Sequence, residues 1–205
     1  MLKIQMLTKI QKIMFLTFMA SLMFPGTARA RDPERKYSIE LSWERNDWIL
    51  KFRPFDYTYL SRTQRMDFLV GKRFRLSFGD FRAFGYFKFD NKDKSWLGTR
   101  LDYGLRTLKQ RLLLDLELRF FQGLNERSKN HFYVIPTAYY KFDQKGRFIA
   151  GLSGYGKKIV REAPFFYIGL DALVRLNKHI RALVSYSTDA YGAGVMIWWI
   201  IYVDF

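Results

Sequence analysis

The sequence predicts an all-β chain, an antiparallel up-and-down transmembrane β-barrel of 10 to 12 strands. Three observations lead to this fold class. Apolar and polar side chains alternate along nearly the whole chain after residue 36, with the period of two that a β-strand has when its two faces meet different surroundings. The chain ends on an apolar and aromatic stretch, residues 195–205, and residues 1–30 have the pattern of an export signal.

The expected export signal has three parts. Lys3, Lys9 and Lys12 form a positively charged beginning without any acid, and residues 13–24 form a mostly apolar segment. That segment is too short to be a comfortable membrane span. Small residues at the possible cleavage site follow, Ala28 and Ala30. We therefore expect a cleavable signal peptide over 1–30 and a single barrel domain over 31–205; the alternative is an N-terminal amphipathic or anchoring helix.

The alternation is clearest between residues 95 and 121. Most leucines of this region fall on one expected strand face, whereas its charged side chains fall on the other. A helix would scatter these charges around its circumference, so the pattern favours strands. Residues 37–44 and 165–176 repeat the pattern, with alternating apolar and polar positions.

The final strand has an apolar face made of alternate residues, Val195, Ile197, Trp199, Ile201, Val203 and Phe205. Together with the export signal, this strand resembles the closing strand of Gram-negative outer-membrane β-barrel proteins, which typically ends on an aromatic residue that the assembly machinery reads. The resemblance implies a location in the bacterial outer membrane and contact with outer-membrane lipid and lipopolysaccharide. It also implies that the barrel-assembly machinery recognises Ile197, Trp199, Ile201, Val203 and Phe205.

Turns and charged connections divide the chain into strands long enough to cross a bilayer when tilted. The expected strands span 36–45, 48–59, 65–78, 81–90, 95–108, 110–124, 131–142, 147–158, 165–176, 180–190 and 195–205. This count is eleven, whereas single-chain bacterial barrels have an even number of strands. Because Pro54 and the basic run 72–75 blur the alternation, we expect a wrong boundary before residue 90 and a barrel of ten or twelve strands.

A soluble alternative shares the same alternation. A secreted β-sandwich or a lipocalin-like barrel would turn its apolar face inward and its charges outward. Two features favour lipid on the outside: glycine and mixed charges on the polar face, and the aromatic residues Trp198, Trp199 and Tyr202 on the final strand. Such aromatic residues are typical of the belts at membrane interfaces.

The composition narrows the possible partners. The chain has 35 Lys and Arg against 19 Asp and Glu, a formal net charge of +16. In a cytosolic protein this excess would suggest nucleic acid, but in an exported protein we expect lipopolysaccharide phosphates or other anions and no nucleic acid. The absence of cysteine excludes disulfides and thiolate metal sites.

The polar face is expected to line the lumen. Its acids and bases are mixed, and those of 95–108 would lie beside those of 110–124 on neighbouring antiparallel strands. One interpretation is a ladder of ion pairs that fills a small barrel, and the other is a charged constriction in a narrow pore, because wide channels need more strands. The expected lumen-lining residues are Glu40, Glu44, Arg100, Asp102, Arg106, Asp115, Glu117, Arg119, Asp171, Arg175 and Asp189, with Lys51 and Arg53 on the same face.

Catalytic motifs are weak. A barrel that modifies lipid A or phospholipids would need a histidine, a nucleophile and an orienting group near the lipid interface. His131 begins a strand near Ser128 and Asn130, but the His-x-Ser spacing of known barrel esterases is absent. Residues 151–157 match the start of a phosphate-binding loop, yet Lys158 stands where Ser or Thr should hold magnesium. We therefore expect no catalytic residues, no metal site and no cofactor.

The expected function is that of a small outer-membrane barrel with a charged, largely filled lumen, acting as a narrow channel or as a structural membrane protein. The alternatives are a scaffold or anchor barrel for a periplasmic or surface partner, and a lipid-modifying enzyme that uses His131.

Overall fold

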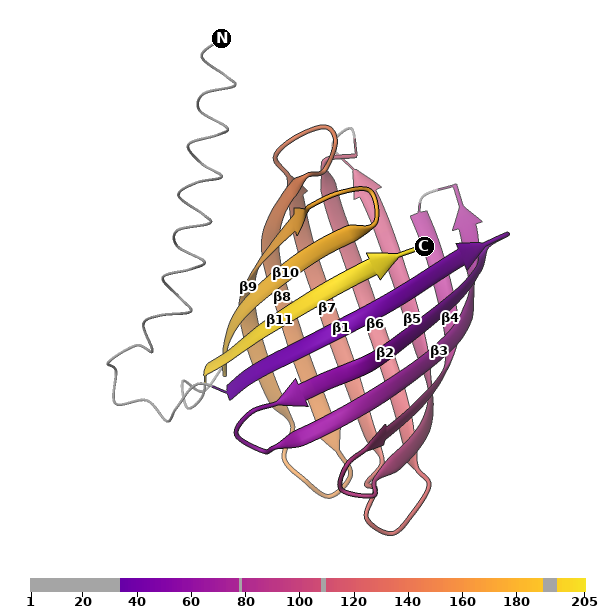
Figure 1. The fold of residues 1–205 in the computed structure, drawn as a ribbon, viewed down its shortest axis with the longest axis vertical. Helices are drawn as coiled ribbons and strands as arrows, with labels where there is room; N and C mark the ends of the chain where they lie inside the picture. Colours follow the sequence, from indigo (N-terminus) through magenta and orange to yellow (C-terminus); the bar gives the residue numbers. More distant parts are fainter. Residues whose placement is uncertain (1–33, 78, 108–109, 190–194) are drawn as a thin grey trace.

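Eleven β-strands close into a single barrel (Figure 1). The structure, a computed structural model, describes residues 34–77, 79–107, 110–189 and 195–205, and gives Asp189 and Val195 by their backbone alone. The predicted signal peptide over 1–30, with Ala28 and Ala30, lies outside the described residues. The strands are β1 (Glu34–Arg45), β2 (Trp48–Thr58), β3 (Thr63–Leu76), β4 (Gly79–Asp90), β5 (Ser95–Thr107), β6 (Leu112–Gly123), β7 (His131–Lys141), β8 (Phe148–Ile159), β9 (Phe165–Arg175), β10 (Ile180–Asp189) and β11 (Val195–Asp204).

The way the barrel closes corrects the predicted strand number. The all-β barrel class and the range of 10 to 12 strands are confirmed, and consecutive strands pair antiparallel, but the narrower expectation of an even number, ten or twelve, is wrong. The expected even number assumes that the first and last strands are antiparallel as well. Here β1 and β11 run in the same direction, with Glu34 opposite Met196 and Ser42 opposite Asp204. A parallel closing pair fits an odd number of strands, so no boundary was missing.

Pro54 explains why the alternation is blurred in β2. The register between β2 and β3 shifts between Arg53 and Asp56, and both of these side chains are buried. Because proline has no N–H to donate to a ladder, it is tolerated at such an irregularity. After the shift, the inward side chains of β2 fall on the other set of alternate positions, and the strand continues. The expected turn at 79–80 is also displaced, because Gly79 already pairs with Leu76 across the hairpin.

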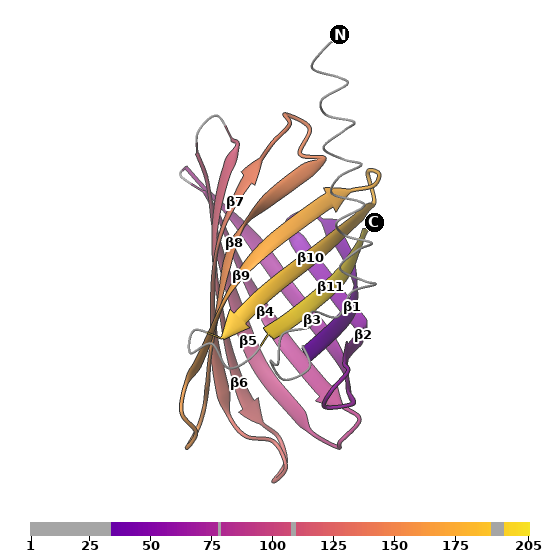
Figure 2. The ribbon, with the colours of Figure 1, turned by 90° about the vertical axis from the view of Figure 1, so that its left-hand side faces the viewer.

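The two ends of the barrel differ. We call the end that holds the connections 59–62, 91–94, 124–130 and 160–164 the loop end, and the end that holds 46–47, 142–147, 176–179 and Phe205 the turn end. Asn46 and Asp47 both have positive φ angles, 52° and 64°, as a tight two-residue hairpin turn requires. Since β1 and β11 are parallel, β1 begins at the loop end and the chain ends at the turn end (Figures 1 and 2).

The polar face of the strands is turned inward and the apolar face outward. Inside the barrel, Glu40, Asp67 and Asp102 are only 2%, 1% and 3% exposed. On the outside, Leu170, Leu97 and Val70 are 63%, 55% and 52% exposed. This arrangement is the reverse of that in a soluble barrel, which buries its apolar face. No helix among the described residues is long and apolar enough to cross a membrane.

Aromatic rings fill part of the interior by lying over glycines of the neighbouring strand. Three directly opposed pairs share this arrangement: Gly71 with Phe84, Gly98 with Phe121, and Gly151 with Tyr139. A Cβ on each of these glycines would come within 3 Å of the facing ring. The glycines therefore make room for large side chains in a narrow barrel. Phe84 and Phe121 belong to the buried apolar cluster, together with Ile49, Leu69, Tyr86, Trp96 and Tyr133.

Candidate functional site: the lumen and a groove on the outer wall

A buried ion-pair network occupies the lumen beside β1, β2 and β3. The Arg53 guanidinium contacts two carboxylates, with Nη2 at 2.5 Å from Glu40 Oε2 and Nη1 at 3.2 Å from Asp67 Oδ2. Lys51 Nζ lies 2.9 Å from the other Glu40 oxygen, and the Tyr86 hydroxyl donates to Asp67 at 2.6 Å. Alternation places Glu40, Lys51 and Arg53 inward, and the bulge keeps Asp56 on the same side, where it accepts from Ser38.

A second network joins β5 and β6. The register places Arg100 opposite Arg119 and Asp102 opposite Glu117. Arg100 donates to Asp102 on its own strand at 2.7 Å and reaches Glu117 at 2.9 Å, while Arg119 donates to Glu117. Each of the two facing arginines thus has a carboxylate beside it, which offsets their mutual repulsion. The expected ladder between these strands is present in the structure.

Other predicted lumen residues lie near the turn end. Glu44 pairs with Arg73 at 2.6 Å, and Arg106 reaches Asp80 at 3.7 Å. Asp115 lies 3.8 Å from Arg82, and the exposed Arg175 ends β9. These side chains are more exposed than the central ones, so they form a rim rather than a constriction. The Asp189 side chain lies outside the described residues.

Beside β7 to β10 the central buried carboxylate is held by hydroxyl groups, and the ion pair described there, Arg181 with Asp204 at 2.9 Å, is about one third exposed. Asp171, 6% exposed, accepts from the Tyr139 hydroxyl at 2.5 Å and from the Ser153 hydroxyl at 3.1 Å. Ser185, directly opposite Asp171, is also buried. Asp171 is therefore inward as expected, but its described partners are neutral.

His131 lies inside the barrel and is 8% exposed. Its Nε2 is 3.0 Å from Lys88 Nζ, and its Nδ1 is 2.9 Å from the Lys129 carbonyl oxygen. An ammonium group donates to Nε2 only when that nitrogen keeps its lone pair, so this geometry fits a neutral ring that donates from Nδ1. Ser128, the nearby serine, instead donates to Asn125 at 2.6 Å. Among the described residues, His131 thus has no serine nucleophile as a hydrogen-bond partner.

The predicted assembly strand is β11. Its residues Ile197, Trp199, Ile201 and Val203 lie opposite β1 across the closing seam, next to Arg35, Tyr37, Ile39 and Leu41. Phe205 is 64% exposed, stacks on Trp43 at 5.0 Å between ring centroids, and donates its N–H to the Ser42 carbonyl. The terminal aromatic ring therefore lies on the outer surface at the turn end.

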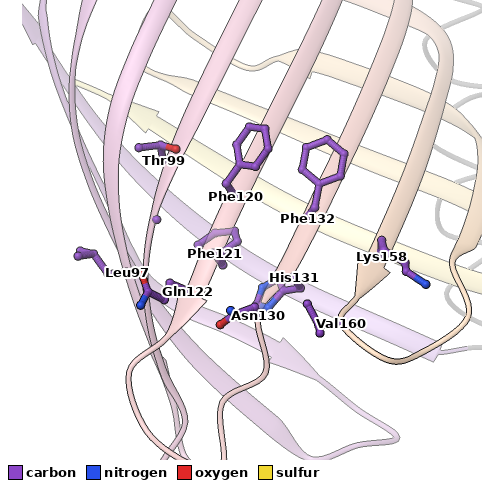
Figure 3. A pocket seen from close by; sticks show the side chains of 11 residues that line it. Leu97, Thr99, Phe120, Phe121, Gln122, Asn130, His131, Phe132, Lys158 and Val160 are labelled. Carbon is purple, nitrogen blue, oxygen red and sulfur yellow. The ribbon is translucent and has the colours of Figure 1, made fainter.

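A groove of about 520 Å³ crosses the outer wall over β5 to β8, close to the loop end (Figure 3). Its apolar side includes Leu97, Val160 and the neighbouring rings of Phe120 and Phe132, whose centroids are 4.6 Å apart. Its other lining residues include Thr99, Gln122, Asn130 and Lys158. The sequence did not indicate this groove, because four strands contribute to it.

Loop charges surround the groove at the loop end. Lys158 Nζ donates to the Glu162 carbonyl, and Lys129 Nζ donates to the Glu162 carboxylate at 2.8 Å. This hydrogen bond lowers the pKa of Glu162 below its ordinary value, because the ammonium stabilises the ionised carboxylate. The Glu162 side chain is thus neutralised by Lys129, while Lys158 contacts only the backbone of the same residue.

Sequence reasoning missed several lumen residues on β3 and β4. Asp67, Tyr86 and Lys88 are all buried and inward, but no role was predicted for them. The alternation Thr63, Arg65, Asp67, Leu69 and Gly71 could have placed Asp67. The mixture of charged and apolar residues on that inward face hid the signal. No group of three or more acidic or histidine side chains in the described parts of the chain could hold a metal ion.

The chain was compared with protein-family models, with curated proteins and with solved structures, and no match was found in any of the three.

Proposed function

We propose that this protein is an outer-membrane β-barrel whose lumen is closed by its own side chains, so that it acts as a structural membrane protein rather than as an open pore. The observation that carries the proposal is the reversed polarity of the barrel wall. Export through a cleaved signal and recognition of β11 by an assembly machinery belong to the same proposal and rest on the sequence pattern.

The outer wall supports a lipid environment. Large apolar and aromatic side chains that are more than a third exposed occur on all eleven strands and at both ends. Water would make such a surface unfavourable, whereas a bilayer removes the penalty. Trp43, Trp48 and Phe205 lie at the turn end and are 37%, 57% and 64% exposed, as expected for an aromatic belt at an interface.

The packing of side chains inside the barrel supports a closed lumen. Every strand except β8 contributes an inward residue that is buried. Arg53 bridges acids on the two strands beside its own, and Arg100 reaches an acid on the adjacent strand, about halfway along the barrel. Moving ions through this region would require breaking buried charge pairs. We therefore expect no steady conductance when the refolded protein is inserted into a planar bilayer, and regular conductance steps would favour the narrow-channel alternative.

A charge placed on the outer wall tests the membrane proposal directly. Leu170 lies in the middle of β9 and is 63% exposed, whereas Leu176 lies just beyond β9 at the turn end and is 66% exposed. In a bilayer, Leu170→Arg should reduce the free energy of unfolding by about 2–4 kcal/mol and Leu176→Arg by about 0–1 kcal/mol. Urea unfolding in lipid vesicles, followed by tryptophan fluorescence, measures both variants.

The same pair gives a clear contrary outcome. In a soluble protein both leucines would face water, and an exposed arginine would change stability little at either position. Equal and small effects of the two variants, together with failure of the protein to float with vesicles, would overturn the membrane proposal.

A further inference from the structure

Polar side chains border the groove on a largely apolar outer wall, with Thr99 and Gln122 at one end and Lys158 at the other (Figure 3). Thr99, Gln122 and Lys158 are all exposed on outward positions of β5, β6 and β8. The next outward positions toward the middle of the barrel on these strands are Leu101, Phe120 and Gly156. Among the described residues, neither the Thr99 hydroxyl nor the Gln122 amide has a hydrogen-bond partner. In a lipid environment such groups need a polar partner, because unsatisfied polar groups are costly there.

The groove also offers an apolar surface beside these polar groups. The rings of Phe120 and Phe132 lie next to one another in Figure 3, with centroids 4.6 Å apart. Leu97 and Val160 are 55% and 52% exposed on either side. A hydrocarbon chain can lie against such a surface.

Lys158 determines the charge of the ligand. It is the one charged residue that lines the groove among the described residues. Its ammonium uses one donor on the Glu162 carbonyl, and an ammonium has three donors. The neighbouring Glu162 carboxylate is already engaged by Lys129. The groove thus presents a cation without a carboxylate partner at the loop end of β8, near the depth at which lipid headgroups lie.

The geometry points to a binding site for one anionic membrane lipid. The lipid phosphate lies at Lys158, and an acyl chain packs across Phe132 and Phe120, the two rings that separate Lys158 from Thr99 in the outward row of side chains. This site rests on the proposed membrane function and adds to it a specific lipid class.

Native mass spectrometry of the folded barrel in detergent, titrated with single lipids, tests the site. The probes are phosphatidylglycerol, phosphatidylcholine and inorganic phosphate. We expect one phosphatidylglycerol to be retained at concentrations where phosphatidylcholine and phosphate are not. Lys158→Gln should weaken this binding about tenfold, the scale of one charge-assisted hydrogen bond. Phe132→Ala should weaken it as well, because the acyl chain loses its contact.

The matched control is Lys72→Gln, which removes an exposed outward lysine from β3 toward the turn end. It should leave phosphatidylglycerol binding unchanged. Equal losses of phosphatidylglycerol binding in Lys158→Gln and Lys72→Gln would show general charge attraction. Retention of phosphatidylcholine equal to that of phosphatidylglycerol would show a non-selective hydrophobic surface. Either result overturns the lipid site. Binding of inorganic phosphate as tight as that of the lipid would show a plain anion site and overturn it too.

Vesicle flotation of the same preparations separates this inference from the proposed function. If the barrel inserts into vesicles but its lipid binding does not depend on Lys158, the membrane function stands and the lipid site is ruled out. A barrel that does not insert removes both.

Discussion

The two halves of the lumen are filled by different chemistry. In the ion-paired half, β1 to β6, buried arginines hold buried carboxylates, as Arg53 does with Glu40 and Asp67. In the hydroxyl half, β7 to β11, the buried carboxylate of Asp171 is held by Tyr139 and Ser153, and the ion pair described there, Arg181 with Asp204, is about one third exposed. Both halves arise from the same alternation of polar and apolar residues. The difference teaches that the period of two decides which side chains point inward, whereas register decides whether they meet a charge or a neutral group.

The largest expected effect lies in the ion-paired half. Arg53→Met leaves Glu40 and Asp67 buried without their shared cation, so it should reduce the free energy of unfolding by about 3–5 kcal/mol. Urea unfolding in vesicles or detergent measures the change.

The control for Arg53→Met is Arg75→Met, which breaks the pair with Asp47 at the turn end. The Arg75 side chain is 71% exposed, so that change should stay within about 1 kcal/mol. Similar losses in the two variants would mean that water reaches Arg53, and the lumen would then not be closed at this level.

A smaller effect is expected in the hydroxyl half. Tyr139→Phe removes the donor to Asp171, which is 2.5 Å away. A hydrogen bond to a charged group contributes about 1.5–3 kcal/mol, so stability should fall by that amount. The same measurement applies, and Tyr140→Phe, on the outward neighbour in β7, is the control. If Tyr139→Phe has no effect, Asp171 is satisfied by other groups and the contrast between the halves is weaker than the geometry indicates.

Gly151, which faces Tyr139, allows a second test of the hydroxyl half. A Cβ on Gly151 would lie 2.0 Å from the Ala138 carbonyl oxygen and 2.7 Å from the Tyr139 Cα and ring. Because the backbone and the ring must both shift, Gly151→Ala should be destabilising by about 1–3 kcal/mol.

Gly85 on β4 provides the matched control. A Cβ there meets only the Val70 carbonyl, at 3.9 Å. Since alanine restricts the unfolded chain more than glycine does, Gly85→Ala should be neutral or stabilising by up to about 1 kcal/mol. Equal effects of the two alanines would mean that Tyr139 does not need the space above Gly151.

The sequence could predict the inward faces but not all of their partners. Arg100, Asp102, Glu117 and Arg119 were identified because one short hairpin joins their strands, so the register follows from the turn. The contacts of Arg53 involve three strands and a bulge beside Pro54, and no local pattern reports such a shift. The parallel pairing of β1 with β11 joins the two ends of the chain, so alternation within each strand carries no information about it. The groove over β5 to β8 likewise depends on rows of side chains across four strands.

The smallest expected effect lies outside both halves, in the loops. Arg127 Nη1 is 2.8 Å from Asp93 Oδ2, and this pair links the connections 124–130 and 91–94. The two side chains are 67% and 83% exposed, so water and salt screen their attraction. Arg127→Ala should therefore reduce the free energy of unfolding by at most about 1 kcal/mol, and the difference from the unaltered protein should shrink further in high salt. Urea unfolding at low and high ionic strength measures both quantities. A loss as large as that of Arg53→Met, persisting in salt, would mean that the loops hold the barrel together as strongly as its buried charges do. The lumen would then not be the main source of its stability.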